Sequence, residues 1–168
     1  MAISRNYADI EEALKDIDSI DRFASEFDIN EKCFSLDHLY DHFTEFRRLI
    51  FDGYHKDIDL GVMLEVNYMI WELMKNAYRS SMSAYQKSCF KTEAFIGSKG
   101  VLVGTQQETE FLTQQQIMLL KEGRNVPSTK IEPPKAGMGT RILVNYGDGV
   151  LISEAEKAVY FSKYFSQA

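Results

Sequence analysis

The side chains best suited to chemistry are a carboxylate and a carboxamide four residues apart, Glu72 and Asn76. Residues at this spacing lie on one face of a helix, so the two polar groups would project together from an otherwise apolar segment. An Asn oxygen can bind Mg²⁺, and a neighbouring Glu can orient water or act as a base. The alternative is a structural pair that satisfies its own hydrogen bonds. The apolar positions of the same segment are Met63, Val66, Ile70, Leu73 and Ala77.

A second candidate element lies further along the chain, where small glycines precede a short apolar segment. Glycines that open a helix let a phosphate approach the backbone, where N–H groups and the positive end of the helix dipole face it. A lysine and an arginine nearby would add positive charge. Together with Glu72 and Asn76, this segment predicts a site for a nucleotide phosphate and its Mg²⁺, with Asn76 as the metal ligand. The residues assigned to it are Lys135, Gly137, Met138, Gly139 and Arg141.

The first part of the chain is expected to form the helices that position this pair. Apolar residues recur every three or four positions from Tyr7 to Phe27, which predicts an amphipathic helix. Ser35 is a favourable cap for a second helix. A third helix, over about 60–84, would carry the carboxylate–carboxamide pair. The residues of the second helix that are expected to face inward are Leu36, Leu39, Tyr40, Phe43, Phe46, Leu49 and Ile50.

The second part of the chain is expected to alternate strands with short helices. Two β-prone runs flank the turn 97–100 and predict a hairpin. Thr113 is a suitable cap for a helix over 111–121. The stretch 123–139 has three prolines and little periodicity, which is typical of a functional loop. The expected strands are 92–96, 101–105, 150–153 and 158–165, and a short helix is expected at 142–146.

The order of these elements, helices first and strands later, predicts an α+β fold. We expect the helices to cover one face of a sheet. With 168 residues, the chain is long enough to bury one substantial core. We divide it into an N-terminal helical extension, 1–59, and a core domain, 60–168. The extension would pack on the core or dimerise.

The order of the motifs resembles the GHKL superfamily, which includes gyrase-type and histidine-kinase-type ATPase domains. Residues 72–79, ELMKNAYR, look like the N box of that superfamily, in the form found in mitochondrial dehydrogenase kinases. Residues 137–139, with the helix and strands after them, are similar to the second glycine box of bacterial anti-sigma kinases. The stretch 123–136 falls where the superfamily has its ATP lid. The resemblance covers about 60–165 and implies a Bergerat-fold, two-layer α/β sandwich, in which helices cover one face of a mixed sheet. It also implies that the domain binds ATP and Mg²⁺.

The adenine-binding box departs from the superfamily pattern. The superfamily places Asp-x-Gly-x-Gly after a strand, and the Asp binds the adenine amino group. Alignment on the strand 101–103 puts Thr105, Gln107 and Thr109 at these three positions. A Thr hydroxyl can hydrogen-bond to adenine, but it lacks the charge and the fixed acceptor role of Asp. The lost glycines also remove backbone freedom. The box is therefore degenerate, and loss of nucleotide binding is an alternative.

Two histidines on the second expected helix offer a further candidate site. His38 and His42 share a helical face, so they could hold a metal ion, or one of them could accept phosphate. The acidic neighbours, Asp37 and Asp41, come before the histidines, whereas histidine kinases have the acid after. A solvated polar edge is the interpretation that we favour.

Composition favours a folded protein of the cytoplasm. The chain is 45% hydrophobic and 12% aromatic, and its net charge of −6 argues against a surface built for nucleic acid or an anionic membrane. No run approaches the roughly 18 apolar residues of a membrane span, and the N-terminus has no apolar signal core. Cys33 and Cys89 match no metal or redox spacing and are expected to be free thiols.

Three functions are consistent with these observations. The first is a regulatory protein with a histidine-kinase-like or anti-sigma-like ATP-binding domain, whose protein partner or second copy docks on the N-terminal helices. In it, Asn76 would hold Mg²⁺, Glu72 would position or activate the nucleophile, and the glycine box would cradle phosphates. The second is a non-catalytic interaction module that has lost the nucleotide. The third is a histidine phosphotransfer protein on a decayed kinase scaffold.

Overall fold

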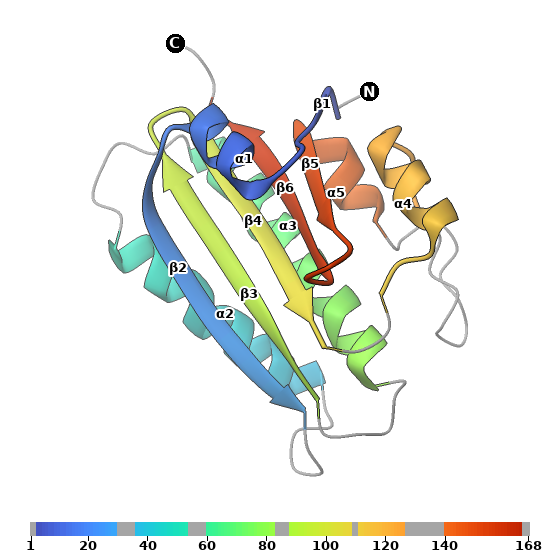
Figure 1. The fold of residues 1–168 in the computed structure, drawn as a ribbon. Coiled ribbons are helices and arrows are strands. Elements are labelled where there is room, and N and C mark those ends of the chain that lie inside the picture. Colours follow the sequence, from blue (N-terminus) through green and yellow to red (C-terminus); the bar gives the residue numbers. More distant parts are fainter. Residues whose placement is uncertain are drawn as a thin grey trace.

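A six-stranded mixed sheet forms the middle of the molecule (Figure 1). The computed structural model describes residues 3–29, 36–53, 60–82, 88–108, 111–126 and 140–165. The strands lie side by side in the order β1-β5-β6-β4-β3-β2, and all neighbours are antiparallel except β1 and β5. The strands are β1 (Arg5–Asn6), β2 (Ser19–Ile29), β3 (Ser88–Gly97), β4 (Gly100–Gln107), β5 (Gly149–Ser153) and β6 (Ala158–Tyr164).

The helices form a layer on one face of the sheet, with one short helix on the other. Three of them, α2 (Leu36–Gly53), α3 (Leu60–Met82) and α5 (Arg141–Tyr146), lie behind the sheet in Figure 1. The helix α1 (Ile10–Ile17) crosses the front face, and α4 (Gln114–Lys121) contacts β5. The predicted mixture of α and β structure with a mixed sheet is confirmed. The position of α1 differs from the expectation that all helices lie on one face.

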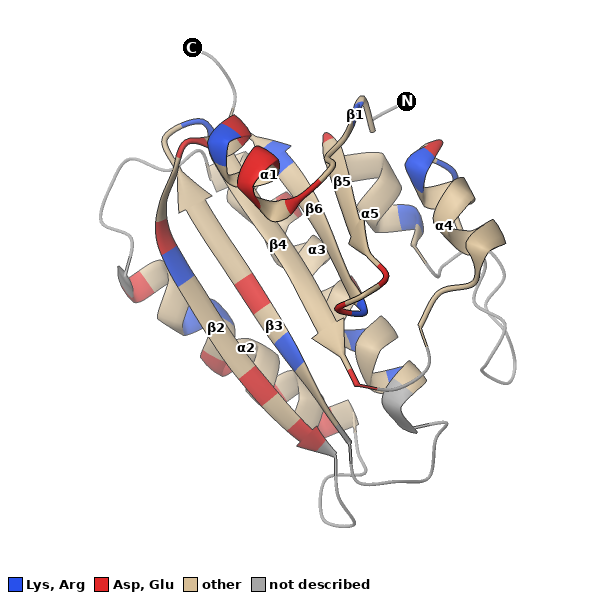
Figure 2. Ribbon diagram, in the orientation of Figure 1, with Lys and Arg blue, Asp and Glu red and all other residues tan. Residues whose placement is uncertain are grey.

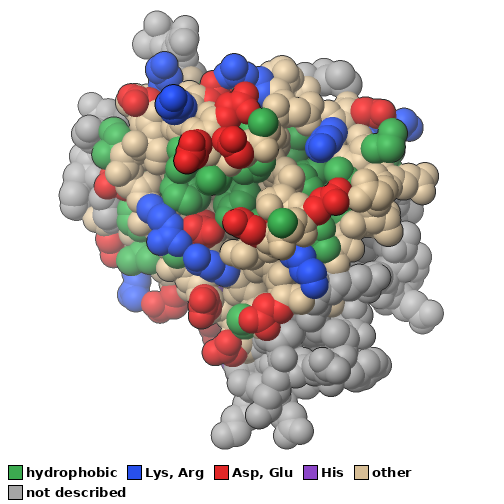
Figure 3. Space-filling model, viewed as in Figure 1, with side chains coloured by type: hydrophobic (Ala, Val, Ile, Leu, Met, Phe, Trp, Pro, Cys, Tyr) green, Lys and Arg blue, Asp and Glu red, His purple; other side chains and the backbone are tan. Residues whose placement is uncertain are grey.

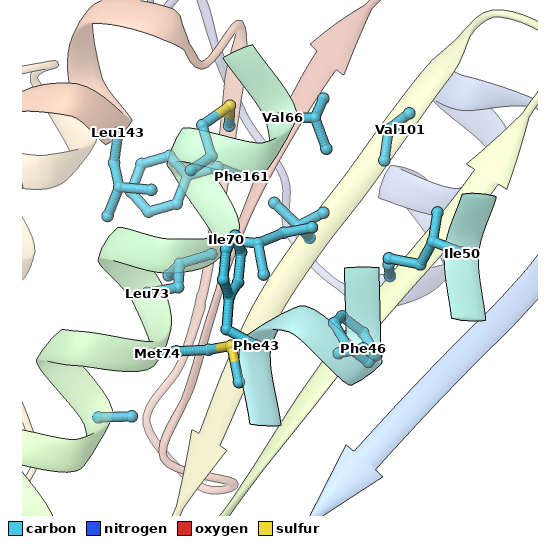
Figure 4. Close-up of a cluster of buried hydrophobic side chains, with 14 of the residues drawn as sticks. Phe43, Phe46, Ile50, Val66, Ile70, Leu73, Met74, Val101, Leu143 and Phe161 are labelled. Atoms are coloured by element: carbon cyan, nitrogen blue, oxygen red, sulfur yellow. The ribbon is translucent and has the colours of Figure 1, made fainter. Parts of the chain in front are cut away.

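The larger core fills the space between the sheet and its helical layer (Figure 4). Strand residues alternate between faces, so Val101 and Val103 of β4 face the helices while Leu102 faces α1. Full burial stabilises each such side chain by roughly 1.5–3 kcal/mol. The residues labelled in Figure 4 are Phe43, Phe46 and Ile50 of α2, Val66, Ile70, Leu73 and Met74 of α3, and Val101, Leu143 and Phe161.

A smaller core lies on the front face, under α1. Ala13 and Ile17 of α1 pack there with Phe95, Leu102 and Tyr160 of the central strands. The space-filling view of this face shows hydrophobic side chains near its middle, with acidic and basic side chains around them (Figure 3). One short amphipathic helix therefore covers only part of the sheet on this side.

The predicted helix over Tyr7 to Phe27 is wrong. The helix α1 ends at Ile17, where Asp18 has a left-handed backbone (φ 54°), and the chain continues as β2. Phe23 and Phe27 are four residues apart, a spacing that fits a helix and also fits one face of a strand. Pairing of β2 with β3 along its whole length decides between the two. The local pattern could not, because the partner strand is far away in sequence.

Residues before position 60 contribute both edges of the sheet. The strand β1 pairs with β5, and β2 pairs with β3. Tyr7 fixes the N-terminal segment, because its hydroxyl donates to Asp16 at 2.6 Å and lies 2.7 Å from Ser162 Oγ. This part of the chain therefore adds strands as well as helices, unlike the purely helical extension expected from sequence. The division of the chain at residue 60 stays a prediction.

Fewer residues of α2 are buried than the sequence predicted. Leu39, Phe43, Phe46 and Ile50 are buried at spacings of three and four, which places them on one face toward the sheet. The other three expected core residues fall outside that arc and are about half exposed. They are Leu36, Tyr40 and Leu49. The expected cap, Ser35, lies outside the described residues.

The later elements follow the sequence closely. The strands β3 and β4 form the predicted hairpin, and α5, β5 and β6 lie where they were expected. Thr113 caps α4 as predicted. Its hydroxyl accepts a hydrogen bond from the Gln116 backbone N–H at 3.2 Å, and the Gln116 side chain accepts one from the Thr113 N–H at 2.9 Å. This reciprocal capping box is a local signal, and local signals can be recognised in a sequence.

Candidate functional site

Glu72 is buried on α3, and its carboxylate is only partly hydrogen-bonded. Its residue is 2% exposed, and Oε1 accepts from Lys75 Nζ at 3.0 Å. Oε2 has no hydrogen-bond partner within the described parts of the chain. Removing a charged oxygen from water without a partner is costly, so such an atom needs an explanation.

The helix α3 presents two buried faces. One contains Ile70 and Leu73 and packs on the sheet. A helix turns about 100° per residue, so Met69, Glu72 and Asn76 form a second face at spacings of three and four. That face lies on the side of α3 away from Trp71, which contacts α2. The predicted pair is therefore set on the flank of α3 and does not point straight into the sheet.

Lys75 is held beside Glu72 by aromatic side chains. Its Nζ lies 5.5 Å from the centre of the Trp71 ring. Trp71 in turn packs against Tyr40 and Phe43 of α2, with ring centres 5.7 and 5.1 Å apart. The ammonium therefore offsets the charge of Glu72 on one oxygen, and the other oxygen is buried without a partner among the described residues.

Asn76 and Arg141 lie on neighbouring elements. Asn76 is half-buried one turn after Glu72, and α5 packs against α3. Arg141 is the first residue of α5 and is exposed. With six residues, α5 is too short for a strong helix dipole, because that dipole is the sum of aligned peptide units. The structure therefore places three of the predicted residues, Glu72, Asn76 and Arg141, on two helices in contact.

A hydrogen-bonded clamp joins the chain just before and just after the segment 127–139. The Thr140 backbone N–H donates to Asn125 Oδ1 at 2.9 Å, and the Thr140 hydroxyl donates to the same oxygen at 3.0 Å. The Val126 N–H donates to Thr140 Oγ1 at 2.7 Å. Asn125 was not predicted as a site residue, because an Asn in a loop gives no sign of a partner fifteen residues away. The clamp fixes where α5 begins relative to α4.

The glycine half of the predicted site lies outside the described residues. This applies to Lys135, Gly137, Met138 and Gly139, and to the predicted ATP lid from residue 127 onward. Their proposed contacts with phosphate stay a prediction.

Thr105 lies inside a strand. It is 4% exposed and pairs with Thr92 of β3 on one side and Val159 of β6 on the other. The strand continues to Gln107, so the backbone is committed to the sheet where the superfamily has a glycine-rich turn. The Thr92 hydroxyl is fully buried and has no hydrogen-bond partner among the residues described. Sequence reasoning missed Thr92, since a Thr in a strand is an ordinary β-former.

His42 is not the solvated residue that the sequence favoured. Its Nε2 lies 3.1 Å from Ser25 Oγ, and its ring packs edge-on against Phe27 with centres 5.0 Å apart. Burial lowers the pKa of His42, and the nearby Glu45 carboxylate opposes this shift. His38 is exposed. No group of three or more His, Cys, Asp or Glu side chains able to hold a metal ion occurs in the described part of the chain.

A second buried glutamate lies on the front face of the sheet. The carboxylate of Glu93 on β3 accepts from the Tyr160 hydroxyl at 2.8 Å and from Arg22 Nε at 2.9 Å. Burial, followed by the hydrogen bond to Glu93, raises the pKa of Tyr160 well above its usual value. Gly104 makes room for the Tyr160 ring, because a Cβ there would lie 2.1 Å from Cδ1. Figure 2 shows the charged positions along β2 and β3.

No protein-family model matches this chain, and no curated protein is significantly similar to it. Within the described ranges, no helix combines the length and the apolar character that a membrane crossing requires.

Proposed function

We propose that this protein is a regulatory module that binds ATP with Mg²⁺ on the flank of α3. The observation that supports this best is the buried carboxylate of Glu72, whose Oε2 has no partner among the described residues. A cation or a positioned water molecule would complete the coordination of that oxygen. The similarity of residues 72–79 to an N box is the reason for proposing ATP and Mg²⁺ as the ligands.

Each residue of the predicted site has a distinct role in this proposal. Asn76 holds Mg²⁺ through its carboxamide oxygen, and Glu72 positions the water or nucleophile. Arg141 is exposed at the start of α5, where its guanidinium can reach a phosphate. Thr105 donates a hydrogen bond to the base. The residues Lys135, Gly137, Met138 and Gly139 cradle the phosphates.

A non-catalytic interaction module is the second candidate, and one observation favours it. The position that reads adenine in the superfamily is occupied here by Thr105, in a strand paired on both sides. A paired strand cannot open to admit a base as a glycine turn can. On this alternative, the Glu72–Lys75 ion pair is a purely structural contact.

Calorimetric titration of ATP and Mg²⁺ tests the proposal. Wild type should bind saturably, and at 100 times Kd the ligand should raise the free energy of unfolding by about 2.7 kcal/mol. Asn76→Ala should weaken binding at least about tenfold, the loss expected when a charge-bearing ligand contact is removed. Asn67→Ala is the matched control, because it changes the same side chain on the same helix.

Absence of binding at about 5 mM ATP, well above the micromolar-to-millimolar range of typical enzyme–substrate affinity, would leave the interaction module. Equal effects of Asn76→Ala and Asn67→Ala would place the nucleotide elsewhere on the protein.

A further inference from the structure

The outer surface of α2 and α3 carries most of the exposed hydrophobic side chains. Six of the eight large hydrophobic residues exposed in the described part of the chain lie on these two helices. The two helices pack side by side behind the sheet in Figure 1, so this surface faces away from the viewer. We call it the α2–α3 surface, and its residues are Leu36, Tyr40, Leu60, Leu64 and Tyr68.

These five side chains form one strip, whereas Leu49 lies on the other side of α2, two turns after His42, whose ring packs on Phe27 of β2. Leu60, Leu64 and Tyr68 are four residues apart along α3, so they follow one another along the helix. Trp71 continues the strip and contacts Tyr40 of α2 through its ring. None of these positions is charged. An apolar strip of this kind on a folded domain marks a surface that another molecule covers.

The charges beside the strip are arranged so that α2 complements itself. Asp41 is exposed in the first half of α2, and neither it nor Asp37 has an ion-pair partner in the described ranges. Arg47 lies in the second half, beside Arg48, whose guanidinium pairs with Glu45 of the same helix at 2.9 Å. If two α2 helices pack antiparallel about Thr44, near the middle of the helix, Asp41 of one lies opposite Arg47 of the other. A second copy of the chain, turned antiparallel, presents the complementary order of charges.

We propose that the α2–α3 surface joins two copies of this protein about a twofold axis, with their α2 helices antiparallel. The helices α2 and α3 are about 27 and 35 Å long at 1.5 Å per residue, and packed helices lie roughly 10 Å apart. The surface is thus roughly 600 Å², which approaches the roughly 800 Å² per partner of a stable interface. Its residues do not include Glu72 or Asn76, so the dimer can be tested separately from nucleotide binding.

Sedimentation equilibrium of the whole chain from about 1 to 200 µM tests this proposal, a range suited to an interface at the small end of the stable class. Wild type should shift from monomer to dimer within that range. Leu64→Glu and Tyr68→Lys should each stay monomeric while keeping the wild-type circular dichroism. Met118→Glu, at an equally exposed hydrophobic position on α4, should still dimerise.

Charge variants test the antiparallel arrangement. Asp41→Arg places two arginines in apposition at each end of the interface and should weaken the dimer by about five- to tenfold. Adding Arg47→Asp to the same chain should restore most of the affinity, because opposite charges face each other again. A wild type that stays monomeric throughout, whether or not another protein or a lipid vesicle binds there, overturns the proposal. So does a dimer that Leu64→Glu and Tyr68→Lys leave unchanged.

Discussion

Two buried glutamates of this protein have opposite surroundings. Glu93 lies on the front of the sheet, and its two oxygens accept from Tyr160 and Arg22. Glu72 lies on α3, where Lys75 occupies one oxygen and no described residue meets the other. Both are less than a tenth exposed. A carboxylate whose bonds are complete contributes to stability, whereas one left incomplete costs stability and is retained for some other reason.

The contrast rests on the surroundings of each carboxylate and needs no reference to a relative. Satisfied polar groups such as Glu93 specify how β2, β3 and β6 pack together. An incompletely hydrogen-bonded group such as Glu72 lowers the stability of the folded state, and functional side chains often do the same. The difference between the two glutamates can therefore be measured by changing each one and following the free energy of unfolding.

Removal of the Glu93 carboxylate is expected to have the largest effect. Glu93→Ala leaves the buried Tyr160 hydroxyl without an acceptor and should lower the free energy of unfolding by about 2–3 kcal/mol. Arg22 contributes little to this loss, because its side chain is half exposed. Urea denaturation measures the change. Glu93→Gln, which keeps an acceptor, should lose about 1 kcal/mol. If Glu93→Ala lowers the free energy of unfolding by less than about 0.5 kcal/mol, roughly the effect of a neutral surface change, Glu93 is not the stabilising residue that the comparison with Glu72 requires.

Crowding the Tyr160 ring should disturb the same network without touching a charge. A Cβ at Gly104 would lie 2.1 Å from Cδ1 of Tyr160 and 2.5 Å from the Val159 carbonyl oxygen. Gly104→Ala should therefore cost about 1–3 kcal/mol through displaced side chains and strand. Thermal unfolding followed by circular dichroism measures it. If Gly104→Ala and Glu93→Ala act through one network, their combined cost should be less than the sum of the two. Full additivity would mean that they act separately.

The sequence predicted best those elements that depend on local signals. The hairpin, α4 with its Thr113 cap, α5, β5 and β6 follow from turn residues, caps and short periodic runs. The strand β2 was missed because its Phe23 and Phe27 fit two periods, and only pairing with distant β3 decides between them. Strand β1 was missed because two residues carry no pattern.

The shared helical face of Glu72 and Asn76 could be predicted from the sequence, but the groups that surround the two side chains could not. The spacing of Glu72 and Asn76 indicated a shared face, and both lie on α3. The bare oxygen of Glu72, the clamp between Asn125 and Thr140, and the buried hydroxyl of Thr92 depend on which residues the fold brings near. Such three-dimensional relationships leave no mark in a single sequence.

The pH dependence of stability distinguishes the Glu93 network from its surroundings. The pKa of Tyr160 is raised in the folded protein, so the folded hydroxyl keeps its proton where an unfolded tyrosine, with a pKa of about 10, loses it. The associated stability is complete below about pH 10 and falls as pH rises above that value, by up to about 1.4 kcal/mol per pH unit. Tyr160→Phe should flatten the decline measured between pH 9 and 11 (roughly one unit either side of the tyrosine pKa). Tyr164, whose pKa burial also raises, adds to the decline. An unchanged slope in Tyr160→Phe would contradict the assignment.

The smallest effect is expected at the other glutamate. Glu72→Gln removes a buried charge whose Oε2 has no described partner, so the free energy of unfolding should change by less than about 1 kcal/mol and could rise. Lys75 loses an ion pair, but its position over the Trp71 ring is retained. Urea denaturation beside Glu93→Gln gives the direct comparison. A loss above about 2 kcal/mol, the range typical of breaking a satisfied buried network, would make Glu72 a structural residue like Glu93. If Glu72→Gln is as stable as wild type but binds Mg²⁺–ATP differently, the unpaired oxygen of Glu72 serves ligand binding and not stability.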